Sequence, residues 1–195
     1  LASGGFNNKY PSAKLKLNLD IADLNKLNLH AGPMKIRGNV DADIPTADPD
    51  FLNGEISLNN IQFVTDKDPV ILDSINIVAV STSDSNSIKV RSQILKADIE
   101  GKYKLTQLAT ALQNTISKYF DPNPKSAKQK TEAQQLAFNI SIDNDPVIYQ
   151  LFPQITGLEP INLKGRYNSV NDSIVLNGTI PRLVFGANTI SGGNI

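Results

Sequence analysis

The sequence predicts a mainly β protein, built as one long, curved antiparallel sheet with an apolar face and a polar face. The first observation is that apolar and polar side chains alternate along most of the chain, for example over 15–21 and 136–142. Such alternation is typical of strands that bury one face only, as antiparallel strands commonly do. The second is that the alternation shifts by one residue at Asn59-Asn60 and again near Leu95. These shifts indicate β-bulges, which bend strands and curve a sheet.

The predicted strands follow one another along the whole chain, and several are long. The runs over 52–65 and 86–104 keep their alternation nearly unbroken. Each would span ~40–60 Å if straight, at ~3.3 Å per residue. Strands of small β-sandwiches are usually about five or six residues long, so these runs favour a wide, curved sheet.

Helical periodicity is confined to three segments. The main one predicts an amphipathic helix of about 15 residues over 105–120, with Thr106 as its N-cap and an Asp-Pro pair at its end. A short helix is predicted over 146–152, with Asp145 as its N-cap and a proline at its first position. A further turn is predicted over 23–27. The apolar face of the main helix comprises Leu105, Leu108, Leu112, Ile116 and Tyr119.

The chain divides into four predicted parts. Residues 1–12 are expected to be a disordered or tag-like N-terminus, and residues 13–120 a β-sheet repeat that ends in the amphipathic helix. Residues 121–134 are polar and rich in lysine and proline, which is typical of a linker or loop. Residues 135–195 are expected to form a second β-sheet repeat, packed on the first. Neither end resembles a natural terminus, so an internal fragment of a longer protein is expected.

A short motif, apolar-x-Gly-x-apolar, recurs five times within the predicted strands. In each copy the glycine takes an inward position where an apolar side chain is expected. Glycines inside strands mark close backbone approach or sharp curvature. Alternatively, the Asn-Gly pairs at 53–54 and 177–178 are hairpin turns. The predicted curvature glycines are Gly38, Gly54, Gly101, Gly165 and Gly178.

A longer echo relates the two halves of the chain. Residues 17–24 followed by 32–38 resemble residues 139–146 followed by 159–165. Both pairs of segments predict a strand, an acidic turn, a short helix, a proline and a glycine-containing strand. The unit could therefore recur along a longer molecule, whose repeats would bury their faces against one another.

The composition excludes most kinds of chemistry. The 195 residues include 19 basic and 19 acidic side chains, no cysteine, and one histidine, His30, in a predicted surface turn. Zero net charge argues against a general nucleic-acid binder, and the absence of cysteine excludes thiol nucleophiles and zinc fingers. The acidic stretch 41–50 lacks the ligand spacing of a calcium loop and predicts a solvated loop. No catalytic residue, metal site or cofactor is predicted, and the chain is not expected to be an enzyme.

The strand motifs resemble those of a known family. Long amphipathic strands with the glycine motif, and the segment Ala-Asp-Ile-Glu-Gly-Lys-Tyr-Lys-Leu at 97–105 leading into a helix, resemble the TamB/AsmA-like proteins of Gram-negative envelopes. The resemblance is closest to the large TamB-like translocation and assembly proteins of Bacteroidetes. It implies a β-taco sheet with a hydrophobic groove in the periplasm. It also implies a parent protein anchored in the inner membrane outside this fragment.

The resemblance further implies that the groove binds or conducts phospholipid between the two membranes and supports outer-membrane protein assembly. Expected partners are phospholipid or other acyl chains, neighbouring repeats of the same longer protein and an outer-membrane assembly barrel protein. The alternative is a secreted β-sandwich interaction module, adhesin-like, in which the same residues form a sealed core. The residues expected on the inward apolar face are Ile36, Val40, Ile56, Leu58, Phe63, Ile75, Ile77, Ile99, Tyr103, Phe138, Ile140, Leu163, Tyr167, Leu176 and Ile180.

Overall fold

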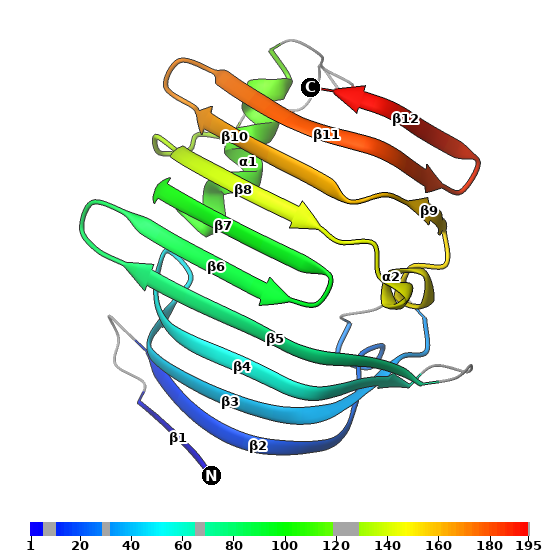
Figure 1. Ribbon diagram of the computed structural model, residues 1–195. Coiled ribbons are helices and arrows are strands. Elements are labelled where there is room, and N and C mark those ends of the chain that lie inside the picture. Colours follow the sequence, from blue (N-terminus) through cyan, green and yellow to red (C-terminus); the bar gives the residue numbers. More distant parts are fainter. Residues whose placement is uncertain (6–10, 29–31, 65–68, 119–128, 195) are drawn as a thin grey trace.

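The chain folds into one open antiparallel sheet with two helices, which confirms the predicted mainly β class. The computed structural model describes residues 1–5, 11–28, 32–64, 69–118 and 129–194 (Figure 1). The strands are β1 (Ala2–Gly5), β2 (Ser12–Asp23), β3 (Lys35–Asp48), β4 (Phe51–Val64), β5 (Val70–Ser81), β6 (Asn86–Ser92), β7 (Leu95–Lys102), β8 (Gln135–Ile142), β9 (Ile155–Leu158), β10 (Ile161–Asn168), β11 (Ser173–Phe185) and β12 (Asn188–Asn194). The helices are α1 (Leu105–Ile116) and α2 (Pro146–Leu151). His30 lies outside the described residues.

The strands are arranged as a meander, because nearly every strand pairs with its neighbour in the sequence. The order across the sheet is β1 to β8, then β10, β11 and β12, and β9 pairs separately with β11. The connection from β7 to β8 contains α1, and the connection from β8 to β10 contains α2 and β9. Strands β1 and β12 form opposite edges, so the sheet stays open (Figure 1). The two predicted repeats are continuous in this sheet, since β7 and β8 are hydrogen-bonded to each other.

The longest strands are bent by irregularities in their pairing. The register of β3 against β4 shifts at Asn59-Asn60, where Asn60 has a φ of 53°. This is the bulge predicted from the shift in alternation. A second shift lies between Asp43 and Thr46 of β3, next to Pro45, which cannot donate a backbone hydrogen bond. Strands β2, β3 and β4 are visibly bowed (Figure 1).

The predicted solvated loop over 41–50 is wrong. Strand β3 continues to Asp48 and pairs with β4 on both sides of the irregularity at Pro45. Only a two-residue connection separates β3 from β4. A proline at a bulge costs no ladder hydrogen bond, so the strand passes through a segment whose composition favours a loop.

Glycine is required where neighbouring backbones come close. Gly54 and Gly101 have φ angles of 148° and 152°, a region that other residues rarely adopt. A Cβ atom on Gly101 would lie 2.2 Å from the Gln135 carbonyl oxygen, and one on Gly54 would lie 2.4 Å from that of Asp43. Gly54 lies within β4 and Gly178 within β11, so neither Asn-Gly pair forms a hairpin turn.

Two predictions about strand limits need correction. The run over 86–104 is not one strand, because it turns back at Gln93 and Ile94 to give β6 and β7. Gln93 donates to the Asp145 carboxylate, and Asp143 donates its backbone N–H to the Ile94 carbonyl. This turn has no glycine, proline or asparagine, and it combines these distant contacts with a local one, in which the Ser92 hydroxyl accepts from the Ile94 and Leu95 backbone N–H groups. Residues 2–5, expected to be disordered, form β1, because backbone pairing with β2 needs no apolar side chains.

Both helices begin near their predicted positions. Helix α2 has Asp145 as its N-cap, and the Asp145 carboxylate accepts from the Val147 backbone N–H at 2.8 Å. Helix α1 ends at Ile116, earlier than the predicted 120, and the Ser117 hydroxyl donates back to the Gln113 carbonyl. The segment 23–27 forms a turn in which the Asp23 carboxylate accepts two backbone N–H groups. Of the predicted linker 121–134, only residues 129–134 are described, and they contain neither helix nor strand.

Candidate functional site

Apolar side chains of neighbouring strands line up in rows that cross the sheet. Directly paired residues of an antiparallel sheet point to the same face, so the register defines which side chains lie together. The longest row crosses β2 to β11 and comprises Leu15, Ala42, Ile56, Ile77, Val90, Ala97, Ile140, Leu163 and Gly178. A second row crosses β4 to β11 and comprises Gly54, Ala79, Ile88, Ile99, Phe138, Gly165 and Leu176. We call this side of the sheet the apolar face.

The fifteen residues predicted to point inward belong to the apolar face, but they occupy three environments. Six pack beside α2, and these are Ile36, Leu58, Phe63, Ile75, Leu163 and Ile180. Two are buried beside α1, and these are Tyr103 and Tyr167. Seven are half-buried and belong to neither hydrophobic cluster, and these are Val40, Ile56, Ile77, Ile99, Phe138, Ile140 and Leu176.

The end of the apolar face beside α2 is densely covered. Val147 packs into a cluster with Ile61, Val70 and Leu72, all of them buried. The neighbouring Ile148 packs into a second cluster that includes Leu158 and Ile161. Two adjacent residues of one short helix thus join the β4–β5 region of the sheet to the β9–β10 region. The gap between these regions is sealed by aliphatic contact.

The end beside α1 is covered differently. Tyr103 and Tyr167 are buried, and the Tyr167 hydroxyl lies 3.1 Å from Thr115 Oγ1 of the helix. Figure 1 shows α1 on the far side of β7, β8 and β10. The helix buries Ala111 and Thr115. The predicted helical face is therefore wrong, since Leu105 and Ile116 are exposed.

The wrong face has a simple cause. Beneath α1 the sheet contributes the large Tyr167 side chain, whose hydroxyl reaches Thr115 of the helix. Large residues below leave room only for small ones above, so Ala111 and Thr115 face the sheet. Leu108 and Leu112 are half-buried, and Tyr119 lies outside the described residues.

Between the covered ends lies a broad, half-exposed apolar region. The seven half-buried residues described above come from six strands, β3, β4, β5, β7, β8 and β11, and their buried neighbours Ala42, Ala79 and Ala97 are small. Small side chains between larger ones leave the sheet backbone close to the surface. This central region is the part of the apolar face that belongs to neither of the two hydrophobic clusters beside α2.

Two of the predicted curvature glycines shape this central region. Gly165 lies beneath the Phe138 ring, since a Cβ atom there would be 2.5 Å from Phe138 Cζ. Gly178 approaches β10, where its Cβ would be 2.4 Å from the Asn162 carbonyl oxygen. Gly38 faces the bulge, 3.0 Å from the Asn59 carbonyl oxygen by the same measure. At all three positions the absence of a side chain allows neighbouring groups of the sheet to approach closely.

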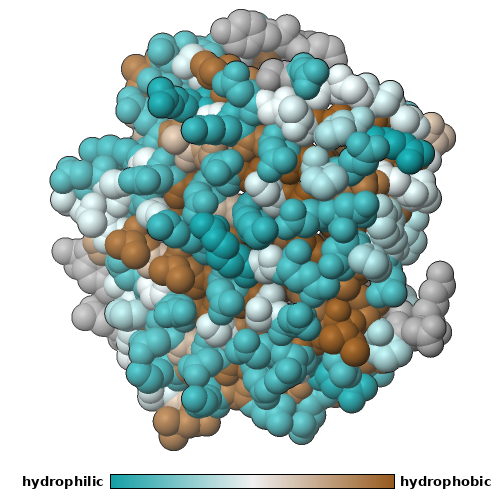
Figure 2. Space-filling model, viewed as in Figure 1, coloured by the Kyte–Doolittle hydropathy of each residue, from teal (hydrophilic) through white to brown (hydrophobic). Residues whose placement is uncertain are grey.

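The opposite face of the sheet is polar. One row across it comprises Lys14, Asp43, Glu55, Val78, Lys89, Asp98, Asn139, Lys164 and Asn177. Figure 2, viewed from the side opposite α1, shows mainly hydrophilic side chains. Ion pairs link neighbouring strands here, for example Lys16 with Asp41 at 3.0 Å. The hydrogen bond from Lys14 to Asp43 raises the pKa of the Lys14 ammonium.

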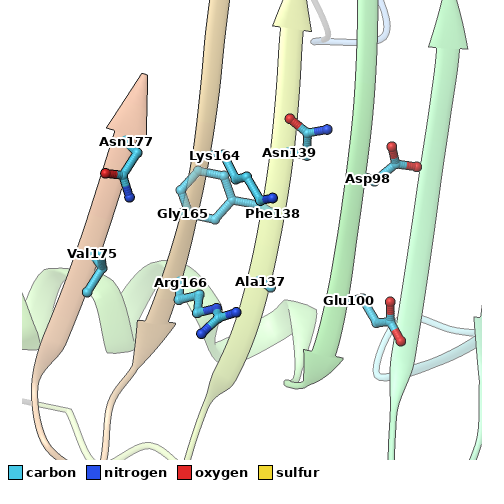
Figure 3. Close-up of a pocket in the computed structure, with 10 residues that line it drawn as sticks. All are labelled: Asp98, Glu100, Ala137, Phe138, Asn139, Lys164, Gly165, Arg166, Val175 and Asn177. Carbon is cyan, nitrogen blue, oxygen red and sulfur yellow. The ribbon is translucent and has the colours of Figure 1, made fainter. Parts of the chain in front are cut away.

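A depression of about 410 Å³ lies on this polar face (Figure 3). Asp98 and Glu100 of β7 line one side, and Lys164 and Arg166 of β10 line the other. Ala137 lies between the two pairs. Because both signs of charge border it equally, the depression favours neither an anion nor a cation alone.

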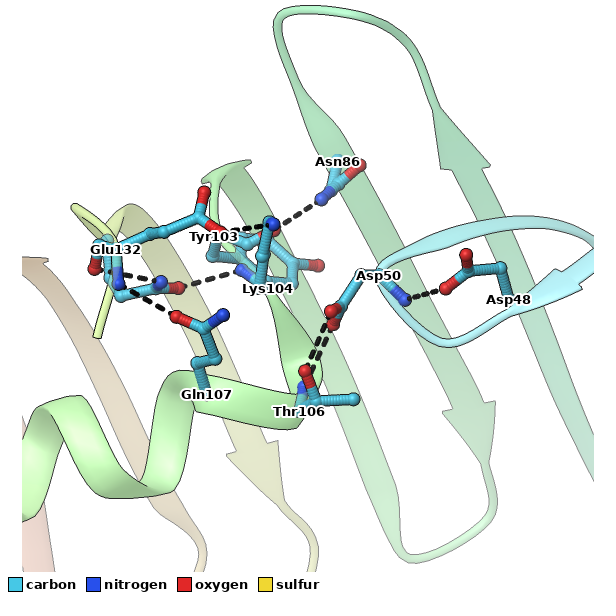
Figure 4. Close-up of polar contacts among 9 residues, drawn as sticks. Asp48, Asp50, Asn86, Tyr103, Lys104, Thr106, Gln107 and Glu132 are labelled. Carbon is cyan, nitrogen blue, oxygen red and sulfur yellow. Dashed lines mark hydrogen bonds and ion pairs between the residues drawn. The ribbon is translucent and has the colours of Figure 1, made fainter. Parts of the chain in front are cut away.

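Polar contacts bind the first turn of α1 to two other parts of the chain, Asp50 and the segment 132–134 (Figure 4). The Asp50 carboxylate accepts from the Thr106 backbone N–H at 3.0 Å and from its hydroxyl at 2.7 Å. The predicted capping role of Thr106 is thus wrong, because Asp50 of the β3–β4 connection caps the helix instead. The Gln134 side chain accepts from the Lys104 backbone N–H, and the Gln107 side chain accepts from the Glu132 backbone N–H.

Charge and burial shift three pKa values at this end of the sheet. The hydrogen bond between Lys104 and Glu132 raises the pKa of the ammonium and lowers that of the carboxyl group. Burial raises the pKa of Tyr103. The Tyr103 hydroxyl has no hydrogen-bond partner among the described residues.

The sequence signal was sufficient for some of these residues and not for others. Ile88 and Val90 complete the apolar rows and share the alternation that identified their neighbours. Asp50 and Asp172 hold α1 from positions more than fifty residues away along the chain. No local pattern identifies such contacts, because their partners are set by the folded sheet.

Comparisons with family models, curated proteins and solved structures find no match. In the described part of the chain, no helix combines the length and apolar character needed to cross a membrane. Those same residues contain no group of three or more acidic, histidine or cysteine side chains placed to hold a metal ion. The evidence on function is therefore the geometry of the two faces.

Proposed function

We propose that this chain is a segment of a periplasmic TamB/AsmA-like protein whose apolar face binds or conducts phospholipid acyl chains between the inner and outer membranes. The observation that carries the proposal is the nine-strand row from Leu15 to Gly178, whose central side chains remain half-exposed. Exposed apolar areas of this continuity mark ligand or partner sites in soluble proteins. In this role the chain has no catalytic residue and needs no cofactor.

The energetics favour an acyl ligand. Burial of one methylene contributes about 0.8 kcal/mol, so ten methylenes laid along the rows would contribute about 8 kcal/mol before the costs of ordering the chain. Aliphatic side chains such as Ile77 and Ile140 offer no hydrogen-bond donors, and an acyl chain requires none. An acyl chain could therefore bind equally well at many positions along the rows. This property suits a surface along which lipids move.

The remaining parts of the proposal concern the longer protein. Neighbouring repeats would continue the sheet at its two open edges, β1 and β12, whose outer backbone groups have no strand partner among the described residues. Such a repeat array, anchored in the inner membrane, would also support outer-membrane protein assembly by engaging a barrel protein. These partners follow from the resemblance of the strand motifs.

The test compares two adjacent residues on opposite faces of β5. Ile77 belongs to the central apolar region, whereas Val78 lies in the polar row and is exposed. We expect phospholipid to co-purify with the wild-type chain in native mass spectrometry. Ile77→Asp should lower the bound lipid at least about tenfold, because a carboxylate on this face carries a large desolvation cost, while Val78→Asp should leave it unchanged. Equal lipid content in both variants, or none in the wild type, would contradict the proposal.

The alternative function, a secreted β-sandwich interaction module, would require two packed sheets with Greek-key connections. The described residues form one sheet with sequential pairing, and β3 and β4 each have 14 residues. No observation on the fold favours this alternative over the open face.

A further inference from the structure

Helix α1 lies over one end of the apolar face, and carboxylates from two different hairpins bind its two ends. Its first turn is bound by Asp50, between β3 and β4. Its last residues are bound by Asp172, between β10 and β11, which accepts from Thr115 and forms an ion pair with Lys118. The helix is ~18 Å long and joins two hairpins whose facing strands, β4 and β10, are five strand spacings apart, or ~24 Å along the sheet.

Between these two attachments the helix is held by few apolar contacts, and its Gln107 and Asn114 side chains bond the backbone of Glu132 and Gln129. Only Ala111 and Thr115 of the helix are buried, and Leu105 and Ile116 are exposed. A cavity of about 400 Å³ lies beside the second half of the helix and is lined by Asn114 and Lys118, among others. Lifting the helix would uncover Tyr103 and Tyr167, but the helix itself contributes few buried apolar side chains. Segments with few buried apolar contacts open most readily.

The closed position also carries an unsatisfied polar group. Tyr103, directly before the helix, is 3% exposed, and its hydroxyl has no hydrogen-bond partner among the described residues. A buried hydroxyl without a partner costs free energy that hydration would restore. Burial of the Tyr103 hydroxyl therefore disfavours the closed position of α1, at the point where the helix begins.

The helix also depends on the sheet for its own stability. Its N-cap residue, Lys104, makes no side-chain capping bond, and neither the first nor the last turn contains a side chain of the sign that favours the helix dipole. Asp50 supplies the missing cap from a different hairpin. Once α1 leaves Asp50, its first turn loses that cap, so detachment and fraying occur together.

We propose that α1 is a strap that opens at the Asp50 and Asp172 attachments and admits acyl chains to the end of the apolar face that it covers. Its role in ligand entry rests on the proposed function, whereas its opening does not. The strap predicts two states of the same folded sheet, with the α2 end closed in both. Opening exposes the region around Tyr103 and Tyr167.

Hydrogen exchange measured by mass spectrometry tests the opening without any ligand. We expect amides of α1 to exchange at least about 100-fold faster than those of β4 to β8 under native conditions. Asp50→Ala should speed α1 exchange a further about fivefold, the effect of losing one cap. Asp84→Ala, in the β5–β6 hairpin, removes an exposed turn carboxylate with only local contacts and should leave α1 exchange unchanged. If the amides of α1 exchanged no faster than those of the strands, the strap proposal would be overturned.

A reversible lock tests the role in ligand entry, and the absence of cysteine makes the background clean. The pair Asp50→Cys and Thr106→Cys ties the first turn of α1 to the sheet when oxidised and frees it when reduced. We expect oxidation to slow uptake of a fluorescent phospholipid from phosphatidylcholine vesicles at least about tenfold, because a strap that cannot open cannot admit the chain.

The matched control is a cysteine pair at Ser57 and Asn76, which are direct partners on the polar face. Oxidation of this pair should leave uptake unchanged. Equal uptake by the oxidised and reduced strap variants would overturn the entry role. Rapid α1 exchange without uptake by any form would support an opening strap and refute the proposed lipid function, so the two failures are distinguishable.

Discussion

The two helices cover opposite ends of strands β8 and β10, and they do so by different chemistry. Helix α2 inserts Val147 and Ile148 into clusters of buried aliphatic side chains and carries its own cap, Asp145. Helix α1 buries one alanine and one threonine and is capped by Asp50 from another hairpin. Apolar packing is lost only when the clusters separate, whereas hydrogen bonds and exposed ion pairs exchange readily with water. The comparison indicates that α2 closes its end of the sheet permanently, whereas α1 can be released from its end.

The largest expected effect comes from truncating an aliphatic side chain at each end. Ile148 is 3% exposed, and Ile148→Ala should lower the free energy of unfolding by about 3 kcal/mol, the usual cost of a large-to-small change in a core. Leu112→Ala in α1 should cost about 1 kcal/mol or less, because that side chain is half-buried and borders loose packing. Urea denaturation of both variants measures the difference. Equal losses would remove the distinction between the two ends.

The next largest effect is expected from removing the carboxylates that cap the two helices. Asp145 caps α2 and also accepts from Gln93, so Asp145→Ala should lower the free energy of unfolding by about 1–2 kcal/mol. Asp50→Ala should lower it by less, because the folded sheet can persist with α1 detached. The loss at Asp50 cannot exceed the free energy of opening α1. Denaturation of both variants in parallel measures this, and a larger global loss for Asp50→Ala would contradict it.

The Tyr103 and Tyr167 hydroxyl groups give a smaller and opposite pair of effects. Tyr103→Phe removes a buried hydroxyl without a partner and should raise the free energy of unfolding by about 1 kcal/mol. Tyr167→Phe should lower it by about 1 kcal/mol, because its hydroxyl lies 3.1 Å from that of Thr115 and both residues are buried. Thermal denaturation measures both. Destabilisation by Tyr103→Phe would show that its hydroxyl has a partner and would weaken the case for the strap.

The fold was predictable because strand periodicity is a local property. Alternation places Ile56 and Ile77 on one side of their strands, and register then brings them together as direct partners. The bulge at Asn59-Asn60 was predictable for the same reason, since an inserted residue shifts the local pattern.

The elements that were mispredicted depend on distant partners. The β6–β7 turn has a local contact at the Ser92 hydroxyl, but Gln93 and Ile94 also bond residues near α2. The buried side of α1 is set by Tyr167, and its cap is Asp50. Single-sequence patterns carry no information on which side chain lies opposite after folding. The apolar face was therefore visible in the sequence, while the helix that closes one end of it was not.

The smallest expected effect concerns the ion pair of Lys104 and Glu132, beside the first turn of α1. The hydrogen bond that Lys104 donates to the Glu132 carboxylate lowers the pKa of Glu132 below the ordinary value of 4.5. A carboxyl group whose pKa is lowered by folding stabilises the folded state above its unfolded pKa, and this contribution is lost as the pH falls through the folded pKa. Glu132→Gln should therefore lower the melting temperature slightly at pH 6, by about 1 °C or less, since exposed ion pairs contribute little.

The difference between this variant and the wild type should vanish as the pH falls through the folded pKa of Glu132, which lies below 4.5, and it should shrink in high salt. Both conditions remove the attraction to Lys104. Glu100→Gln is the matched control, since Glu100 is exposed on the polar face of β7. A melting-temperature difference for Glu132→Gln that is independent of pH would assign the effect to packing. In that case the attachment of α1 would depend on Asp50 and Asp172, and the first turn would lift without breaking any ion pair.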